Sequence, residues 1–247
     1  MKRVTFFLIS IFTTIVFSAS AQQPADPKST EVWEPIPKMV NPGKQDNQPP
    51  SDAIVLFNGK DLNEWSTMKG EAAKWKVSHN SMIVVKGTGG IRTKKGFGDC
   101  QLHVEWKTPS VVEGEGQGRG NSGIFLMGKY EVQVLDSYNN RTYSNGQAGS
   151  IYKQHIPLVN ASRPPGQWQS YDIIFKAPRF NSDGTLQSPG YFTVLHNGVL
   201  VQNHVELKGT TANTGLQVYT KHADKEPITL QDHGNPVEYR NIWVREL

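Results

Sequence analysis

Cysteine is nearly absent from this chain. Its 247 residues include a single Cys100, so no intramolecular disulfide can form. In the segment Asp99–Trp106, Cys100 has the same alternation parity as Leu102 and Val104, which predicts a small buried side chain rather than a catalytic thiol. Without disulfides the fold must depend on a hydrophobic core, and the roughly 195 residues after residue 52 are enough to build one.

The chain also has no marked excess of charge and no helical pattern. Its 26 basic residues, of which Lys2 and Arg3 lie in an N-terminal leader, nearly balance 22 acidic residues. The neighbourhoods of Lys94-Lys95 and Lys221 are too small for a nucleic-acid footprint. Apolar residues nowhere recur at helical spacing over three turns, and no repeat of propeller or solenoid period is present. We therefore expect neither a nucleic-acid partner nor a helical fold.

Several catalytic signatures are missing too. The sequence has no Gly-x-Ser-x-Gly, His-Glu-x-x-His, phosphate-binding loop or Cys-x-x-Cys, which disfavours serine hydrolases, zinc peptidases and nucleotide-dependent enzymes. Glycines between Gly114 and Gly120 have the spacing of a dinucleotide fingerprint, but a strand rather than the required helix is predicted after them. We expect no nucleotide cofactor. The segment is predicted to be a loop at the rim of the fold, from which Arg119 could reach a site.

The one long apolar run lies near the N-terminus. Lys2 and Arg3 precede the segment Val4–Phe17, and Ala19-Ser20-Ala21 is a small-residue cleavage site. This pattern predicts a signal peptide over residues 1–21, cleaved after Ala21. The run is too short for a membrane span, and no cysteine follows the cleavage site to carry a lipid. We predict an exported, periplasmic protein whose mature form has no membrane span.

Residues 22–52 are predicted to be a linker or N-terminal arm. From Gln22 to Pro50 the sequence contains much Pro, Lys, Asn and Gln and little apolar periodicity. Trp33 and Ile36 could dock this arm against the folded domain, which we expect to cover residues 53–247.

From Ala53 onward nearly every signal is that of a β-strand. Short β-branched or aromatic runs, separated by turn residues, predict strands. They are Ile54–Phe57, Trp75–Val77, Met82–Val85, Gln101–Lys107, Ile124–Met127, Tyr130–Leu135, Tyr171–Lys176, Tyr191–His196, Val199–Gln202, Gly215–Tyr219 and Asn241–Arg245. Asn197-Gly198 between two of these runs is a strong hairpin signal. This pattern predicts an all-β jelly-roll β-sandwich.

The stretch from Gly118 to Asp136 is the most informative for function. It predicts two strands joined at Gly128-Lys129, and in the second strand Glu131 and Gln133 share one face. Burying a carboxylate and a carboxamide in a dry core would be costly. We interpret this face as a binding surface; the alternative is an ordinary solvated sheet face.

Two features near the C-terminus add candidate residues. His233, in the loop sequence Gln231-Asp232-His233-Gly234, could act as a ligand, base or acid, or the loop could be a surface turn that satisfies its own backbone. Arg240 has the parity of Ile242 and Val244 in the last predicted strand. An inward Arg needs a carboxylate or a substrate oxygen, unless a bulge near Asn241 turns it to solvent.

Six segments together carry a resemblance to a known family. They are Leu56–Leu62, Gly120–Phe125, Tyr130–Asp136, Gly149–Tyr152, Gln231–Gly234 and Tyr239–Ile242. The chain after the linker resembles the 3-keto-disaccharide hydrolase family, long catalogued as a domain of unknown function. The resemblance implies a concanavalin- or lectin-like jelly roll that cleaves glycosides whose sugar carries a ketone at C3, by β-elimination, net hydrolysis or both. A divalent metal is implicated in related enzymes.

The chemistry that the resemblance implies can be matched to residues. A C3 ketone acidifies the C2 hydrogen, so the site needs a base near C2, a donor or cation at the C3 oxygen, and an acid for the leaving oxygen. The candidate catalytic residues are Glu131, His233, Arg240 and Tyr152, and the candidate substrate-binding residues are Asn121, Gln133, Asp136, Lys94 and Gln231. Glu131 is the first choice for the base because a strand holds it rigidly. Glu131, Gln133 and His233 are also candidate ligands of a divalent ion such as Zn, Mn or Ca.

Other functions remain open on the sequence. A non-catalytic carbohydrate-binding module is one, because the same sandwich serves lectins. An ordinary glycosidase is less favoured, because Asp136 lies off the face of Glu131 and no second carboxylate is placed beside it. For the favoured function the partner is an oxidised 3-keto sugar, which a separate glycoside 3-oxidoreductase would supply.

Overall fold

The compact part of the molecule is an all-β sandwich, as predicted. The computed structural model describes residues 26–45 and 47–247, and residues from Val40 to Leu247 form a compact unit. The preceding segment contains one 3₁₀ turn, η1 (Pro27–Thr30). The predicted signal peptide lies outside the described residues. Within the ranges given above, no helix has the length and apolarity needed to cross a membrane.

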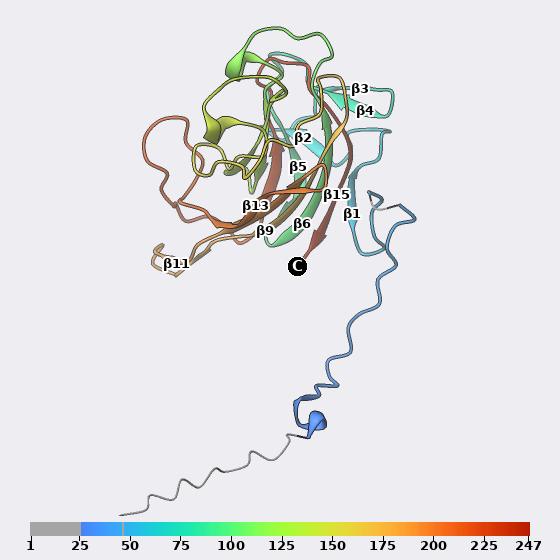
Figure 1. Cartoon of the computed structure of the whole chain (residues 1–247), viewed down its shortest axis with the longest axis vertical. Helices are drawn as coiled ribbons and strands as arrows, with labels where there is room; N and C mark the ends of the chain where they lie inside the picture. Colours follow the sequence, from blue (N-terminus) through green and yellow to red (C-terminus); the bar gives the residue numbers. More distant parts are fainter. Residues whose placement is uncertain (1–25, 46) are drawn as a thin grey trace, which may run out of the picture. The chain divides into compact units, whose positions relative to one another are not determined.

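Two antiparallel sheets form the sandwich (Figure 1). The larger has eight strands in the order β13-β12-β9-β6-β15-β4-β3, with β1 paired to β15. Its strands are β1 (Ile54–Phe57), β3 (Lys76–Ser78), β4 (Ser81–Ile83), β6 (Cys100–Lys107), β9 (Gln169–Lys176), β12 (Tyr191–His196), β13 (Val199–Glu206) and β15 (Glu238–Glu246).

The smaller sheet has five strands in the order β2-β5-β14-β7-β8. They are β2 (Trp65–Thr67), β5 (Ile91–Phe97), β7 (Ser122–Leu126), β8 (Tyr130–Val134) and β14 (Glu226–Leu230). A separate ribbon pairs β10 (Arg179–Phe180) with β11 (Leu186–Ser188), and two further 3₁₀ turns are η2 (Gly116–Gly118) and η3 (Ser144–Gly146). Strand β8 is therefore an edge strand, which matters for the site described below.

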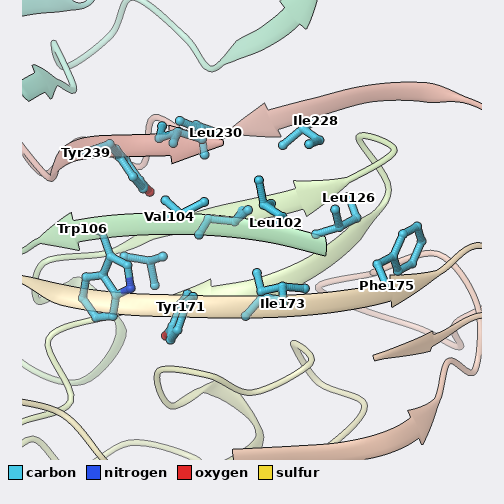
Figure 2. Packing of buried hydrophobic residues seen from close by; sticks show 14 of the residues in the cluster. Leu102, Val104, Trp106, Leu126, Tyr171, Ile173, Phe175, Ile228, Leu230 and Tyr239 are labelled. Atoms are coloured by element: carbon cyan, nitrogen blue, oxygen red, sulfur yellow. The ribbon is translucent and has the colours of Figure 1, made fainter. Parts of the chain in front are cut away.

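The core lies between the sheets and follows from strand alternation. On β6, every second side chain from Cys100 to Trp106 is fully buried, and β9 alternates in the same way. Figure 2 shows the labelled residues of these two strands packed with Ile228 and Leu230 of β14: Leu102, Val104, Trp106, Tyr171, Ile173 and Phe175. Burying each large apolar side chain contributes about 1.5–3 kcal/mol. Burial also raises the pKa of Cys100 to about 12, which agrees with its predicted role as a small core residue.

The predicted turns and strands can be compared with the structure. Asn197 and Gly198 join β12 to β13 with φ of 53° and 78°, the positive values that a tight hairpin turn requires. The predicted strand Gly215–Tyr219 is wrong: the segment has no partner strand, and Leu216 and Val218 are exposed. Its backbone contact is a single bond from the Thr210 N–H to the Val218 carbonyl at 3.0 Å, which is too little to build a strand.

The end of the predicted arm is tied to the larger sheet. Asn47 donates to Glu105 Oε1 at 2.9 Å, and its carbonyl accepts from Asn241 Nδ2 at 2.8 Å and from Trp243 Nε1 at 3.1 Å. These partners lie on the face of β6 and β15 that points away from the core. The compact unit thus includes part of the segment expected to lie outside it.

Candidate functional site

The candidate site lies on the outer face of the smaller sheet. On β8, Val132 and Val134 point into the core, whereas Glu131 and Gln133 point the other way, next to Phe125 and Gly123 of β7. Glu131 is only 4% exposed and Gln133 only 1%. The face is polar but not solvated, so the alternative interpretation of an ordinary wet sheet face is wrong.

Loops cover this face and enclose a cavity of about 270 Å³. The Tyr152 N–H donates to the Glu131 carbonyl at 3.2 Å, and the Glu131 N–H donates to Thr211 Oγ1 at 3.0 Å. These two bonds fasten two separate loops along the free edge of β8. The cavity is lined by Asn121, Phe125, Glu131, Gln133, Tyr152, Thr211, Asn213, Gln231 and His233.

The Glu131 carboxyl group occupies space that only a glycine neighbour leaves free. A Cβ on Gly123 would lie 2.5 Å from Glu131 Oε1 and 2.8 Å from the Phe125 ring. Burial raises the pKa of Glu131 to about 8. A base whose pKa lies near neutrality is the kind that removes a carbon-bound proton most efficiently at physiological pH.

Gln133 connects Glu131 to the glycine-rich loop. One terminal atom of its carboxamide lies 3.0 Å from Glu131 Oε1 and 3.1 Å from the Ser122 carbonyl. The other terminal atom lies 3.0 Å from Gln117 Oε1. Gln117 is anchored by a bond from Nε2 to the Gly146 carbonyl at 2.9 Å. The loop predicted to lie at the rim thus supports the floor of the site through Gln117, a residue that sequence reasoning did not select.

His233 is held at the cavity wall by its neighbour. The Asp232 carboxylate accepts from the N–H groups of Gly87 at 2.8 Å, Gly89 at 3.0 Å and Gly234 at 2.9 Å. The loop is therefore fixed by Asp232 while His233 faces the cavity. Both interpretations of this segment hold in part, because the turn satisfies its own backbone and still presents the imidazole.

Two carboxamides complete the polar lining. Gln231 Oε1 is buried without a hydrogen-bond partner among the described residues. Asn121 is 3% exposed, and its Nδ2 donates to the Gln117 carbonyl at 2.7 Å. A buried oxygen without a partner is costly unless a ligand satisfies it. The structure therefore brings together Glu131, Gln133, Tyr152, Asn121, Gln231 and His233 from the residues predicted by sequence.

Arg240 does not belong to this group. The pairing of β15 with β6 shifts between Arg240 and Trp243, and Asn241 has φ of 45°. This bulge reverses the alternation, so Tyr239 enters the core and Arg240 lies on the outer face of the larger sheet. There its Nε donates to Glu105 Oε2 at 2.6 Å. The expected grouping of Arg240 with Glu131 is therefore wrong, and the alternative of a bulge near Asn241 is the one that the structure contains.

Asp136 and Lys94 also lie away from the cavity. Asp136 accepts from Arg119 Nε at 2.7 Å, and both residues line a different cavity of about 180 Å³. Lys94 is exposed on β5 and is not among the residues lining the Glu131 cavity. Thr211 and Asn213 line the cavity but carried no signal in the sequence, because loop closure rather than strand pattern brings them there. Phe125 also lines the cavity and was not selected as a site residue.

Comparisons with known proteins agree with this fold. Residues 52–245 match the family described as the 3-keto-alpha-glucoside-1,2-lyase-like domain. A curated relative, the 3-keto-disaccharide hydrolase of Bacteroides thetaiotaomicron, is 25% identical over 315 aligned residues, covering 100% of both chains. The crystal structure of a candidate glycosyl hydrolase from Parabacteroides distasonis is 52% identical, with a TM-score of 0.86 over 90% of this chain and 97% of that one. Another from the same organism, 20% identical with a TM-score of 0.58 over 85% of this chain and 100% of that one, shows the fold alone.

Proposed function

Because the chain belongs to the 3-keto-alpha-glucoside-1,2-lyase-like domain family, we propose that it cleaves 3-keto-glycosides by removing the C2 proton and eliminating the C1 substituent. Water addition to the product then gives net hydrolysis. The observation that carries the proposal is Glu131, a buried carboxyl group of raised pKa on a rigid strand, facing an enclosed polar cavity. The name of the Bacteroides relative, a 3-keto-disaccharide hydrolase, supports the same substrate class.

Each step has a residue in reach of the cavity. The C3 carbonyl acidifies the C2–H bond, Glu131 accepts the proton, and the electron pair forms an enolate. Donors on His233 or the carboxamide of Asn121 stabilise the charge on the C3 oxygen. The enolate collapses, the C1–O bond breaks, and the leaving oxygen takes a proton from Tyr152. This assignment gives Tyr152 the role of the acid.

The arrangement suits elimination better than ordinary glycoside hydrolysis. Among the described residues that line the cavity, Glu131 is the single carboxylate. Retaining and inverting glycosidases use two carboxyl groups across the scissile bond. Asp136, the nearest candidate in sequence, is paired with Arg119 elsewhere. A ketone at C3 removes the need for the second carboxylate, because it makes the C2 proton acidic.

The donor set also fits a divalent ion. No group of three or more His, Cys, Asp and Glu side chains that could hold a metal occurs in the part of the chain that the structure describes. A bound ion would therefore use Glu131 and His233 together with a carboxamide oxygen of Gln133 or of Gln231, whose Oε1 has no partner. Such an ion would supply a Lewis acid for the keto oxygen. Metal analysis of the purified protein tests this, and full activity of chelated protein would remove the idea.

The decisive experiment supplies a 3-keto-glucoside to the protein and its parent glucoside as the control. We expect an ultraviolet-absorbing enone or a free 3-keto sugar, release of the aglycone from the oxidised substrate, and no turnover of the parent. Glu131→Gln should lower turnover by roughly 10²-fold or more and abolish exchange of the C2 hydrogen with deuterated solvent. Wild-type exchange in this variant would assign the base to another residue. Binding without turnover would favour a carbohydrate-binding module.

A further inference from the structure

A cluster of four side chains at the cavity wall reaches from the substrate space to solvent. Tyr152 lines the cavity, and its hydroxyl lies 2.5 Å from the hydroxyl of Tyr143, which is 40% exposed. Lys153 and Asn213 complete the cluster, with Lys153 Nζ bonded to Asn213 Oδ1 at 2.9 Å and to the Asn213 carbonyl. Two loops far apart in sequence therefore meet at these four residues.

The chemistry of the partners fixes the direction of each hydrogen bond. An ammonium group can only donate, so Asn213 must present Oδ1 to Lys153. The Tyr152 hydroxyl lies 3.2 Å from the same oxygen and donates to it. With that proton committed, the short bond between the phenols has Tyr143 as donor and Tyr152 as acceptor. The resulting hydrogen-bond chain runs from the exposed Tyr143 through Tyr152 to Asn213 Oδ1 at the cavity wall.

The surroundings hold Tyr143 in place and set a cation beside both phenols. The Tyr143 ring lies over Gly146, where a Cβ would overlap the ring, and the Lys153 N–H donates to the Asn145 carbonyl at 2.8 Å. Lys153 Nζ lies 5.4 Å from the centre of the Tyr143 ring and 5.7 Å from that of Tyr152. Burial raises the pKa of Tyr152, and a cation at this distance offsets part of the cost of a transient phenolate by Coulomb attraction.

We propose that Tyr143 is a positioning and proton-supplying residue that acts through Tyr152 during departure of the leaving group. This inference rests on the proposed function. As the C1–O bond breaks, its electron pair goes to the leaving oxygen, and the Tyr152 hydroxyl turns from Asn213 Oδ1 to give that oxygen its proton. The Tyr152 phenolate takes the proton of Tyr143, and Tyr143 regains one from water. Glu131 returns the C2 proton to C2 when water adds to the enone, or releases it to solvent, so the protein ends each cycle in the protonation state in which it began.

The test compares two leaving groups in the full-length protein. A sugar leaving group departs as a strongly basic alkoxide and needs the acid, whereas p-nitrophenolate leaves without one. Tyr143→Phe should slow turnover of a 3-keto-disaccharide by about tenfold and change that of p-nitrophenyl 3-keto-glucoside by less than about twofold. Tyr152→Phe should show the same selectivity with a larger loss, roughly 10²-fold. Tyr138→Phe, at a tyrosine 38% exposed beside the same loop, is the matched control.

Exchange of the C2 hydrogen, measured in the same samples, separates this inference from the proposed function. Proton removal precedes departure of the leaving group, so exchange in Tyr143→Phe should keep the wild-type rate. Equal slowing of both substrates, or of neither, with exchange intact would overturn the relay and leave the proposed function standing. A wild-type protein that neither exchanges the hydrogen nor cleaves the substrate would overturn both.

Discussion

Replacing Glu131 with Gln should make the protein more stable at alkaline pH. The carboxyl group is 4% exposed and its pKa is raised from 4.5 to about 8 by burial. Below pH 4.5 both the folded and unfolded states hold the proton, so burial of the charge costs nothing. Between pH 4.5 and 8 unfolding releases the proton, and stability falls as pH rises by about 1.4 kcal/mol per pH unit. Above pH 8 the free-energy cost of burying the ionised carboxylate no longer changes with pH and is about 5 kcal/mol.

Glutamine has nearly the same shape and no charge, so the variant escapes this cost. Urea unfolding of chelated wild-type and Glu131→Gln proteins from pH 4.5 to 9 measures the difference directly. We expect similar stability at the acid end and a gain of several kcal/mol for the variant at pH 9. Glu113→Gln, at an exposed carboxylate, should show no such trend. A gain that is independent of pH, or a loss at pH 9, would refute the reasoning.

Three further predictions concern the site and its surroundings. Gly123→Ala should displace the Glu131 carboxylate and lower turnover by about tenfold or more. The melting temperature, measured by circular dichroism, should fall by only a few degrees, because the atoms nearest the new methyl group are at the far end of a side chain. Arg240→Ala should leave KM for the keto sugar within about twofold in steady-state assays. It should lower the free energy of unfolding by about 2 kcal/mol, because the buried Glu105 carboxylate loses one of the two cations beside it. Asn47→Ala should lower stability by about 1 kcal/mol in urea unfolding, without changing turnover.

The strands and the polar face of β8 could be predicted because they are local properties. Alternation within Tyr130–Val134 decides which side chains share a face, and no distant contact changes that. Strands β5 and β14 were missed because their sequences contain charged residues together with Gly96 and Pro227. Pairing with neighbouring strands, not propensity, makes these segments extended.

The site was predicted in part for the same reason. The alternation of one strand, β8, predicts that Glu131 and Gln133 share a face. His233 was selected from the motif of the loop that follows β14. Arg240 was misplaced because a bulge shifts the alternation by one residue, and the sequence shows no glycine or proline at Asn241 to mark it. Asn213 and Thr211 reach the cavity through loop closure, which depends on contacts between segments about 60 to 80 residues apart.

The fastening of Asn47 has a practical consequence for handling the protein. Asn47 meets the sheet on the outer face of β6 and β15, whereas the Glu131 cavity opens on the outer face of the other sheet. Asn47 therefore marks a point on the face of the sandwich opposite the cavity. A tether attached there for immobilisation on a solid support would leave the mouth of the cavity unobstructed, and substrates could be flowed over an oriented layer of molecules.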